Sequence, residues 1–196
     1  MKVLGLDIST SNVGLCLIDS DRSQSNRVVF AAGYPISKVK GLYAKSGAVQ
    51  TAFLQVSRAH DVDVVVVEEP LEAFRKGMSS AHTIAQLNRF NGIVSFLART
   101  VFDKPVVLCN AVEARRNVGI RLDKKSEIGT KDQVFSWVRS RPEMHNFEWP
   151  TKILKSGPRS GELKEEAHCY DIADAFVVSL WGSMFVKIDQ VDADVV

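Results

Sequence analysis

The sequence predicts an α/β protein built on a mixed five-stranded sheet, in which three antiparallel strands precede parallel ones and helices cover both faces. Three observations carry this prediction. Two alternating apolar segments flank the polar turn 9–12, which is typical of a β-hairpin. Residues 62–67 form an almost continuous β-branched run, which is typical of a central strand buried on both faces. Apolar residues between 80 and 100 then recur at helical spacing.

The N-terminal part of the chain predicts an antiparallel meander followed by a helix. Lys2–Ile8 and Val13–Asp19 are the two strands of the hairpin, and Arg27–Ile36 is the third strand. The spacing of apolar residues then becomes helical over Gly41–His60, with a buried stripe formed by Leu42, Val49, Ala52, Phe53 and Val56.

The middle of the chain predicts two further strands with a long helix between them. Val62–Val67 is the central strand, and Ser79 or Ser80 is placed to cap a helix that extends to about Thr100. Pro105–Cys109 is the fifth strand. Two strands that alternate with helices in this way are expected to run parallel.

The C-terminal part predicts three helices. One begins at about Ala111, and a loop of mixed charge over Arg121–Thr130 leads to a second helix over Lys131–Arg139. The prolines and glycines of Arg141–Gly161 predict an irregular or only partly helical segment. Glu165–Val186 returns to helical spacing.

Length and composition predict one domain. The chain has 196 residues, of which 45% are hydrophobic and 24% are charged, and this is ample for one buried core. The sequence contains neither an internal repeat nor a linker. We therefore expect a single domain over residues 1–188, followed by an acidic C-terminal tail over 189–196.

Cysteine usage and hydropathy exclude several classes of protein. Cys16, Cys109 and Cys169 are scattered and odd in number, so they indicate neither a zinc site nor a disulfide framework. No apolar run approaches the roughly 20 residues of a membrane span, and polar residues follow Asp7 where a signal peptide would need its apolar core. We expect a soluble, unexported protein in a reducing cytosol, with no membrane partner.

The net charge of +2 conceals an uneven distribution. Residues 112–164 contain 12 basic and 7 acidic residues, whereas residues 165–196 contain 1 and 7. Such a pattern is common on solvated surfaces. The alternative is that the basic residues bind a polyanion while the carboxylates hold its counter-metal.

Four carboxylates stand out by their positions. Asp7 lies inside the first strand, where a charge is costly unless it is paired, hydrogen-bonded or bound to a metal. Glu68 ends the central strand, and alternation points Glu69 to the other face. Asp171 and Asp174 lie three residues apart on one face of an apolar helix, so they repel each other unless a cation lies between them. The alternatives are a turn-capping aspartate, a solvent-facing glutamate and a solvated polar stripe.

In this order, the carboxylates resemble the catalytic cluster of RNase H-like nucleases, and the chain resembles the RuvC-type Holliday-junction resolvases in particular. The resemblance covers most of the chain, through the motifs GLDISTSNVG, VVVVEEPLEAF, QLNRFNG, VEARRNVG, TKDQV and DIADAF. It implies an RNase H-like fold. It also implies four catalytic residues that are the metal ligands, with Glu69 as the substitute if the strand register differs by one: Asp7, Glu68, Asp171 and Asp174.

The resemblance also implies the chemistry. Oxygen ligands without a thiolate favour Mg²⁺, with Mn²⁺ as a substitute, and two such ions per active site hydrolyse a phosphodiester to 5′-phosphate and 3′-hydroxyl ends. The partners implied are branched DNA, a four-way junction, and a second copy in a homodimer. His168 lies one helical turn before Asp171 and is either a phosphate or water contact or a satisfied histidine.

Basic and aromatic residues are candidates for DNA contacts. The resemblance places Lys131 next to the phosphate and places Phe74 in a loop where an aromatic residue wedges into unstacked bases, flanked by Arg75 and Lys76. A second group is a candidate for gripping the DNA backbone: Arg115, Arg116, Arg121, Lys124 and Lys125. The alternatives are an ordinary lysine at a helix start and solvated surface charges.

Two features depart from the family pattern. Asp7-Ile8-Ser9 replaces the family's D-P-G, which keeps the ligand but alters the turn. The segment Arg141–Gly161 is longer than expected, and its side chains are candidates for widening the DNA footprint: Trp149, Lys152, Lys155 and Arg159. This divergence favours a phage-encoded enzyme, acting in the cytoplasm of a bacterial cell or of a phage-infected host.

Three other functions compete with a resolvase. LDISTSNVG also resembles the first phosphate-binding hairpin of actin-like ATPases and sugar kinases, but those proteins need a second domain for which 196 residues leave no room. A catalytically inactive nucleic-acid-binding module would leave the four carboxylates without a role. A less specific nuclease that nicks branched, flapped or replicating DNA remains open.

Overall fold

The computed structural model describes residues 1–70 and 81–188. Phe74, Arg75 and Lys76 lie outside the described residues, as do the predicted start of the long helix and the predicted tail over 189–196.

The core of the protein is a five-stranded sheet with the strand order β3-β2-β1-β4-β5. Its strands are β1 (Lys2–Ile8), β2 (Asn12–Asp19), β3 (Val28–Pro35), β4 (Val64–Glu68) and β5 (Val106–Cys109). The first three strands pair antiparallel, and β4 and β5 run parallel to β1. The predicted mixed sheet is therefore confirmed.

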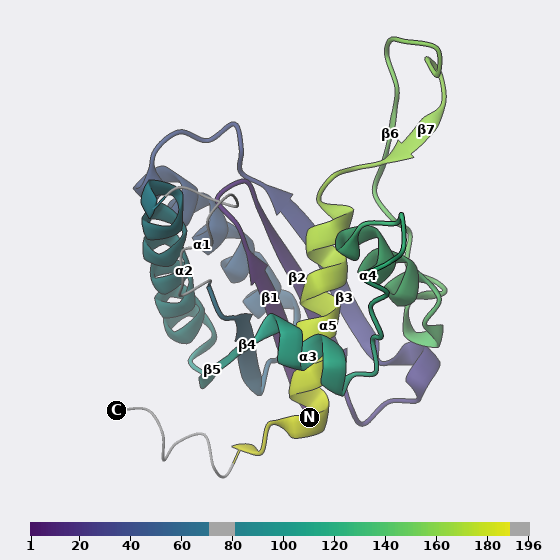
Figure 1. Cartoon of the computed structure of the whole chain (residues 1–196). Coiled ribbons are helices and arrows are strands. Elements are labelled where there is room, and N and C mark those ends of the chain that lie inside the picture. Colours follow the sequence, from purple (N-terminus) through teal and green to yellow (C-terminus); the bar gives the residue numbers. More distant parts are fainter. Residues whose placement is uncertain (71–80, 189–196) are drawn as a thin grey trace.

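Helices cover both faces of this sheet (Figure 1). On one face, α1 (Leu42–Ala59) and α2 (Ala81–Phe102) enclose a core with Leu4, Leu6 and Val65. On the other face lie α3 (Ala111–Asn117), α4 (Thr130–Arg139) and α5 (Cys169–Phe185), over a core that includes Val3, Val64 and Val66. Alternate residues of each strand thus belong to different cores, as the pleat of a strand requires. No helix within the described ranges is long and apolar enough to cross a membrane.

Glycines let α5 pack directly on the backbone of β1 and β2. A Cβ atom added to Gly5 would lie 2.4 Å from the carbonyl oxygen of Ala175, and one added to Gly14 would lie 2.0 Å from that of Asp171. Ser179 adds a hydrogen bond of 2.7 Å from its hydroxyl to the carbonyl of Val3. Because Gly14 pairs with Asp7, this close approach brings the start of α5 to the end of β1.

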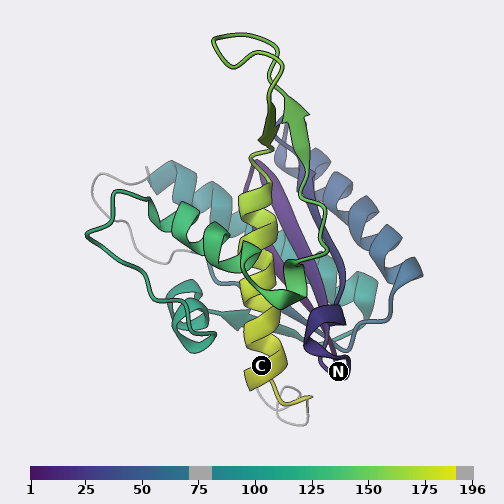
Figure 2. The same ribbon diagram turned by 90° about the vertical axis from the view of Figure 1, so that its right-hand side faces the viewer.

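The segment after α4 differs from the prediction. It contains the short helix η2 (Pro142–Met144) and a separate antiparallel hairpin of β6 (Thr151–Ile153) and β7 (Leu163–Glu165), which projects from the body of the protein (Figures 1 and 2). The helix predicted to begin at Glu165 begins at Cys169. The reason is that Glu165 pairs with Thr151, which keeps the chain extended at that point. A second short helix, η1 (Gln24–Asn26), precedes β3.

Candidate functional site

The four carboxylates predicted from the sequence lie at one end of the molecule. Asp7 is near the carboxyl end of β1 and Glu68 ends the neighbouring β4, where Leu6 pairs with Val67 in parallel register. Asp171 and Asp174 occupy the first two turns of α5, which packs on the same face of the sheet. The structure therefore brings a strand-end pair and a helix pair together from distant parts of the sequence.

The strand register distinguishes Glu68 from its neighbour. Glu68 continues the face of Val64 and Val66, both of which belong to the core beneath α5. Glu69 points to the opposite face, and its backbone N–H donates to the carbonyl of Cys109 over 2.8 Å. The register thus places Glu68 on the face of α5, and its role as a ligand in place of Glu69 stays a prediction.

Burial and mutual repulsion raise the pKa values of these carboxyl groups. The pKa of Asp7 lies well above its usual value because of burial and then the charges of Glu68, Asp174 and Asp171. Burial, followed by the charge of Asp174, raises the pKa of Glu68 from 4.5 to about 7. Burial also raises the pKa of Asp171 from 3.8 to about 6, with Asp174 adding to this effect and Lys131 opposing it. These carboxyl groups repel one another when they are ionised, so the cluster favours a bound cation.

Two basic residues from other elements reach this cluster. The Nη2 atom of Arg115, on α3, donates to Oδ1 of Asp174 over 2.9 Å, and both side chains are largely buried. Burial lowers the pKa of Arg115, but the charges of Asp174 and Glu68 outweigh that effect and raise it. Lys131, in the first turn of α4, lowers the pKa of Asp7, Glu68 and Asp171 by its charge. Two of the predicted DNA contacts therefore lie beside the carboxylates.

The donor set fits a hard divalent cation in its chemistry. All four candidate ligands are carboxylates, and burial together with the charges of neighbouring carboxylates raises the pKa values of Asp7, Glu68 and Asp171. In the described part of the chain, however, no three His, Cys, Asp or Glu side chains converge closely enough to hold a metal ion. The carboxylate of Asp174 instead forms an ion pair with the guanidinium of Arg115. Metal binding at this cluster would require the carboxylates to turn toward one another.

The turn after Asp7 shows how the altered family motif is accommodated. The backbone N–H and the hydroxyl of Ser9 both donate to the carbonyl of Asn12, at 3.0 and 2.9 Å. The N–H of Asn12 in turn donates to the Ser9 hydroxyl oxygen over 3.0 Å. Ser9 therefore closes the β1–β2 turn with its own side chain and leaves the carboxylate of Asp7 to the site.

The remaining predicted basic residues form no ion pair with the carboxylates of the described chain. Arg116 on α3 is exposed, as are Arg121, Lys124 and Lys125 in the loop before α4. This loop is ordered by Gln133, whose Nε2 atom donates to the carbonyls of Asp123 and Ile128, at 2.9 and 2.7 Å. The loop thus presents its basic side chains to solvent from an anchored base, and their binding to DNA stays a prediction.

His168 belongs to the packing of the sheet. His168 is 8% exposed, and a Cβ atom added to Gly33 of β3 would lie 2.5 Å from the His168 ring. The strand β3 is two strands away from β1. His168 is thus buried against β3, and its contact with a phosphate or a water stays a prediction.

Sequence reasoning missed one residue that positions the site. Asn91 on α2 is 4% exposed, and its Nδ2 atom donates to the backbone carbonyl of Glu68 over 3.2 Å. Ser95 donates to Oδ1 of Asn91 over 3.3 Å. The signal was a polar residue on the apolar stripe of Phe90 and Val94, within the motif QLNRFNG.

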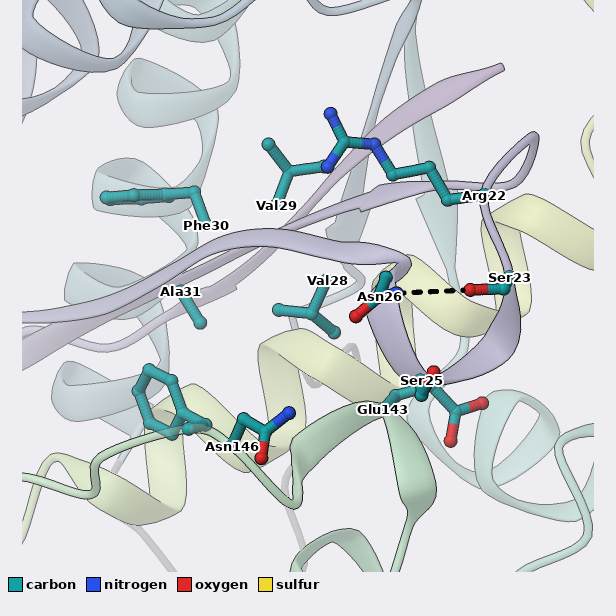
Figure 3. Close-up of a pocket in the computed structure, with 11 residues that line it drawn as sticks. Arg22, Ser23, Ser25, Asn26, Val28, Val29, Phe30, Ala31, Glu143 and Asn146 are labelled. Carbon is teal, nitrogen blue, oxygen red and sulfur yellow. Dashed lines mark hydrogen bonds between the residues drawn. The ribbon is translucent and has the colours of Figure 1, made fainter.

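A cavity of the described residues lies elsewhere. It measures about 660 Å³ and is lined by β3, the turn before it and the residues after η2, as Figure 3 shows. Glu143 lines it, but Oε1 of Glu143 already accepts hydrogen bonds from Gln24 and Arg141, both at 3.2 Å. These contacts link the loop before β3 to η2. We therefore assign Glu143 a role in holding these two segments together. The carboxylate cluster remains the candidate site.

Comparison with solved structures identifies the fold. RuvC of Thermus thermophilus in complex with a Holliday junction is 17% identical, with a TM-score of 0.62 and 94% of each chain covered. A second structure of Thermus thermophilus RuvC is 16% identical with a TM-score of 0.58, over 94% of this chain and 95% of that one. The yeast mitochondrial Holliday junction resolvase Ydc2 is 15% identical with a TM-score of 0.57, over 98% of this chain and 80% of that one. No protein-family model matches the chain, and no curated protein matches it. The chain therefore has the RNase H-like fold of RuvC-type resolvases, which confirms the predicted fold class.

Proposed function

We propose that this chain, with its RuvC-type fold, is a metal-dependent endodeoxyribonuclease that resolves four-way DNA junctions. The observation that carries the proposal is the convergence of Asp7, Glu68, Asp171 and Asp174 on one face of the sheet. The fold supports it, because one of the similar structures is a Holliday junction resolvase by name and another, RuvC, is in complex with a Holliday junction substrate.

Each carboxylate has a role as a metal ligand in the proposed reaction. Asp7 and Glu68 come from adjacent parallel strands and Asp171 and Asp174 from one helix, so each pair would supply two of the four ligands. Mg²⁺ or Mn²⁺, two ions per site, would supply an activated water and stabilise the leaving oxygen.

The two basic side chains of the site, those of Lys131 and Arg115, act on the DNA itself. Lys131 and Arg115 lie close enough to the carboxylates to affect their pKa values, so both are placed to neutralise the phosphate that is cut. In the protein without DNA, Arg115 holds Asp174 in an ion pair of 2.9 Å. Transfer of its guanidinium from Asp174 to the phosphate would couple DNA binding to assembly of the ligand set.

A homodimer completes the proposed activity. One cluster of four carboxylates makes one nick, whereas an open four-way junction has two-fold symmetry and needs two. Two copies related by the same axis supply both cuts. On a supercoiled plasmid with an extruded cruciform, this arrangement predicts linear product without accumulation of nicked circles.

The test compares cleavage of end-labelled junction, flap, fork and duplex DNAs in Mg²⁺. Wild-type protein is expected to cut the junction at paired symmetric positions, and Asp7→Asn, Glu68→Gln and Asp174→Asn are expected to cut none of the DNAs while still binding the junction. Glu69→Gln is the matched control, because it removes an adjacent carboxylate on the other face. Equal cutting of flaps and forks would instead support the less specific nickase, and unimpaired cutting by Asp7→Asn would refute the site.

A further inference from the structure

The hairpin β6–β7 has no role in the cleavage reaction proposed above. It projects beyond the sheet at the end where α5 begins (Figures 1 and 2). We propose that this hairpin is a DNA-binding arm, whose lysines contact the backbone of the junction and whose apolar pair contacts unstacked bases at its centre. The inference rests on the proposed function and extends it to how the junction is recognised.

The register of the hairpin gives it two different faces. Lys152 pairs with Lys164, and the next pair, on the opposite face, is Ile153 with Leu163. All four residues are exposed, with 61% of Ile153 and 66% of Leu163 accessible to solvent. One face is thus cationic and the other apolar, and the protein covers neither.

The charges of the hairpin are unbalanced toward the cationic side. Its two glutamates are already paired, Glu162 with Arg159 at 2.5 Å and Glu165 with Arg139 of α4 at 2.6 Å. Three lysines remain that form no ion pair with any described residue: Lys152, Lys155 and Lys164. A polyanion is the partner that complements these charges.

The base of the hairpin is fastened to the start of α5, close to the carboxylates. The carbonyl of Pro150 accepts hydrogen bonds from the N–H of Glu166 over 2.9 Å and from the thiol of Cys169 over 3.3 Å. Cys169 is two residues before Asp171. DNA that lies at the carboxylate cluster must therefore pass beside the hairpin.

Trp149 is half-buried at the base of the hairpin, and its predicted contact with DNA stays a prediction. Its ring packs edge-on against Phe135 and Phe147, with ring centroids 4.8 and 4.9 Å apart. The tryptophan is part of the anchor of the hairpin, and the exposed side chains beyond it form the contact surface.

The geometry favours DNA over a protein partner. A two-stranded ribbon fits a DNA groove, and exposed aliphatic side chains insert where base stacking is already interrupted, as it is at the centre of a junction. A protein partner for the apolar pair alone would leave the lysines of the other face unmatched. The two faces thus predict two separable effects, one on DNA in general and one on the junction.

The experiment measures affinity for a fluorescent four-way junction and for duplex DNA in Ca²⁺, as a function of salt. Lys152→Ala/Lys164→Ala is expected to weaken both complexes and to lower the salt slope by about 2, and Lys152→Arg/Lys164→Arg is expected to restore both. Ile153→Ser/Leu163→Ser is expected to weaken junction binding roughly tenfold and to leave duplex binding unchanged. The matched control, Arg58→Ala/Lys104→Ala, removes two exposed cations from the opposite end of the molecule and should bind like wild type.

The outcomes separate this inference from the proposed function. If wild-type protein fails to prefer the junction, the proposed function is wrong. If wild type prefers the junction but the lysine and apolar variants bind like the control, the DNA-binding arm is refuted. A change in the mass of the DNA-free protein on Ile153→Ser/Leu163→Ser, with junction affinity retained, would assign the apolar pair to self-association and likewise overturn it.

Discussion

Replacement of Glu68 by glutamine is expected to abolish cutting and, at the same time, to stabilise the metal-free protein above pH 7. Glu68 lies in a buried site beside Asp174, which raises its pKa from 4.5 to about 7. The folded protein therefore binds this proton more tightly than the unfolded chain. The stability that the protonated group contributes is present below pH 4.5 and is lost as the pH rises through about 7.

The size of the effect follows from the same pKa difference. At 1.36 kcal/mol per pH unit, ionised Glu68 costs the folded protein about 3 kcal/mol at pH 8. Glutamine has nearly the same shape and no charge, so Glu68→Gln recovers up to that amount. For a domain of this size, about 3 kcal/mol corresponds to roughly 6–12 °C in Tm.

The assay is thermal unfolding in EDTA at pH 5 and pH 8, followed by the same measurement at pH 8 with Mg²⁺. We expect Glu68→Gln to exceed wild type in Tm at pH 8 and to exceed it much less at pH 5, where Glu68 of the folded protein is protonated. Mg²⁺ should then raise the Tm of wild type more than that of the variant, because only wild type keeps the full ligand set. Glu69→Gln serves as the control and should show neither effect.

The refuting result is specific. A Glu68→Gln variant that is less stable than wild type at pH 8, or equally stabilised at both values of pH, would show that burial and the neighbouring carboxylates do not raise the pKa of Glu68.

Three further predictions test other parts of the site. Arg115→Gln should destabilise the metal-free protein at pH 8 by about 1–3 kcal/mol in urea unfolding, because it leaves Asp174 unpaired. A change below about 0.5 kcal/mol would argue against this ion pair. Calorimetric Mg²⁺ affinity should tighten from pH 6 to pH 8, since Glu68 and Asp171, with pKa values of about 7 and about 6, must lose protons to bind; a flat profile would contradict this. Gly14→Ala should cost about 3 kcal/mol and most of the activity, because its Cβ would lie 2.0 Å from a carbonyl of α5, whereas Gly47→Ala meets no atom within 4 Å and should be tolerated.

The sequence by itself determined the strands of the sheet and the faces of two catalytic candidates. The period of a strand is a local property, so alternation alone placed Asp7 with Val3 and Gly5, and Glu68 with Val64 and Val66, while Glu69 took the other face of its strand. The β-branched run over 62–67 likewise predicted the central strand, observed as Val64–Glu68. Helical spacing placed Asp171 and Asp174 on one side of a helix. These inferences needed no knowledge of distant residues.

Only the tertiary structure decided how these pieces meet. The contact of α5 with β1 and β2 depends on the absence of side chains at Gly5 and Gly14, residues more than 150 positions away in the chain. The support of Glu68 by Asn91 and the pairing of Arg115 with Asp174 also join distant segments. No local pattern encodes such contacts, because they depend on packing between elements.

The conformation of the hairpin β6–β7 was also decided by tertiary contacts and not by a local pattern. Its prolines and glycines predicted an irregular segment, and its strands contain three residues each, too few for a recognisable alternation. It is held in place by bonds at its base, from Arg139 to Glu165 and from Glu166 to the carbonyl of Pro150. A two-stranded ribbon has little stability of its own, so its conformation depends on the helices to which it is attached.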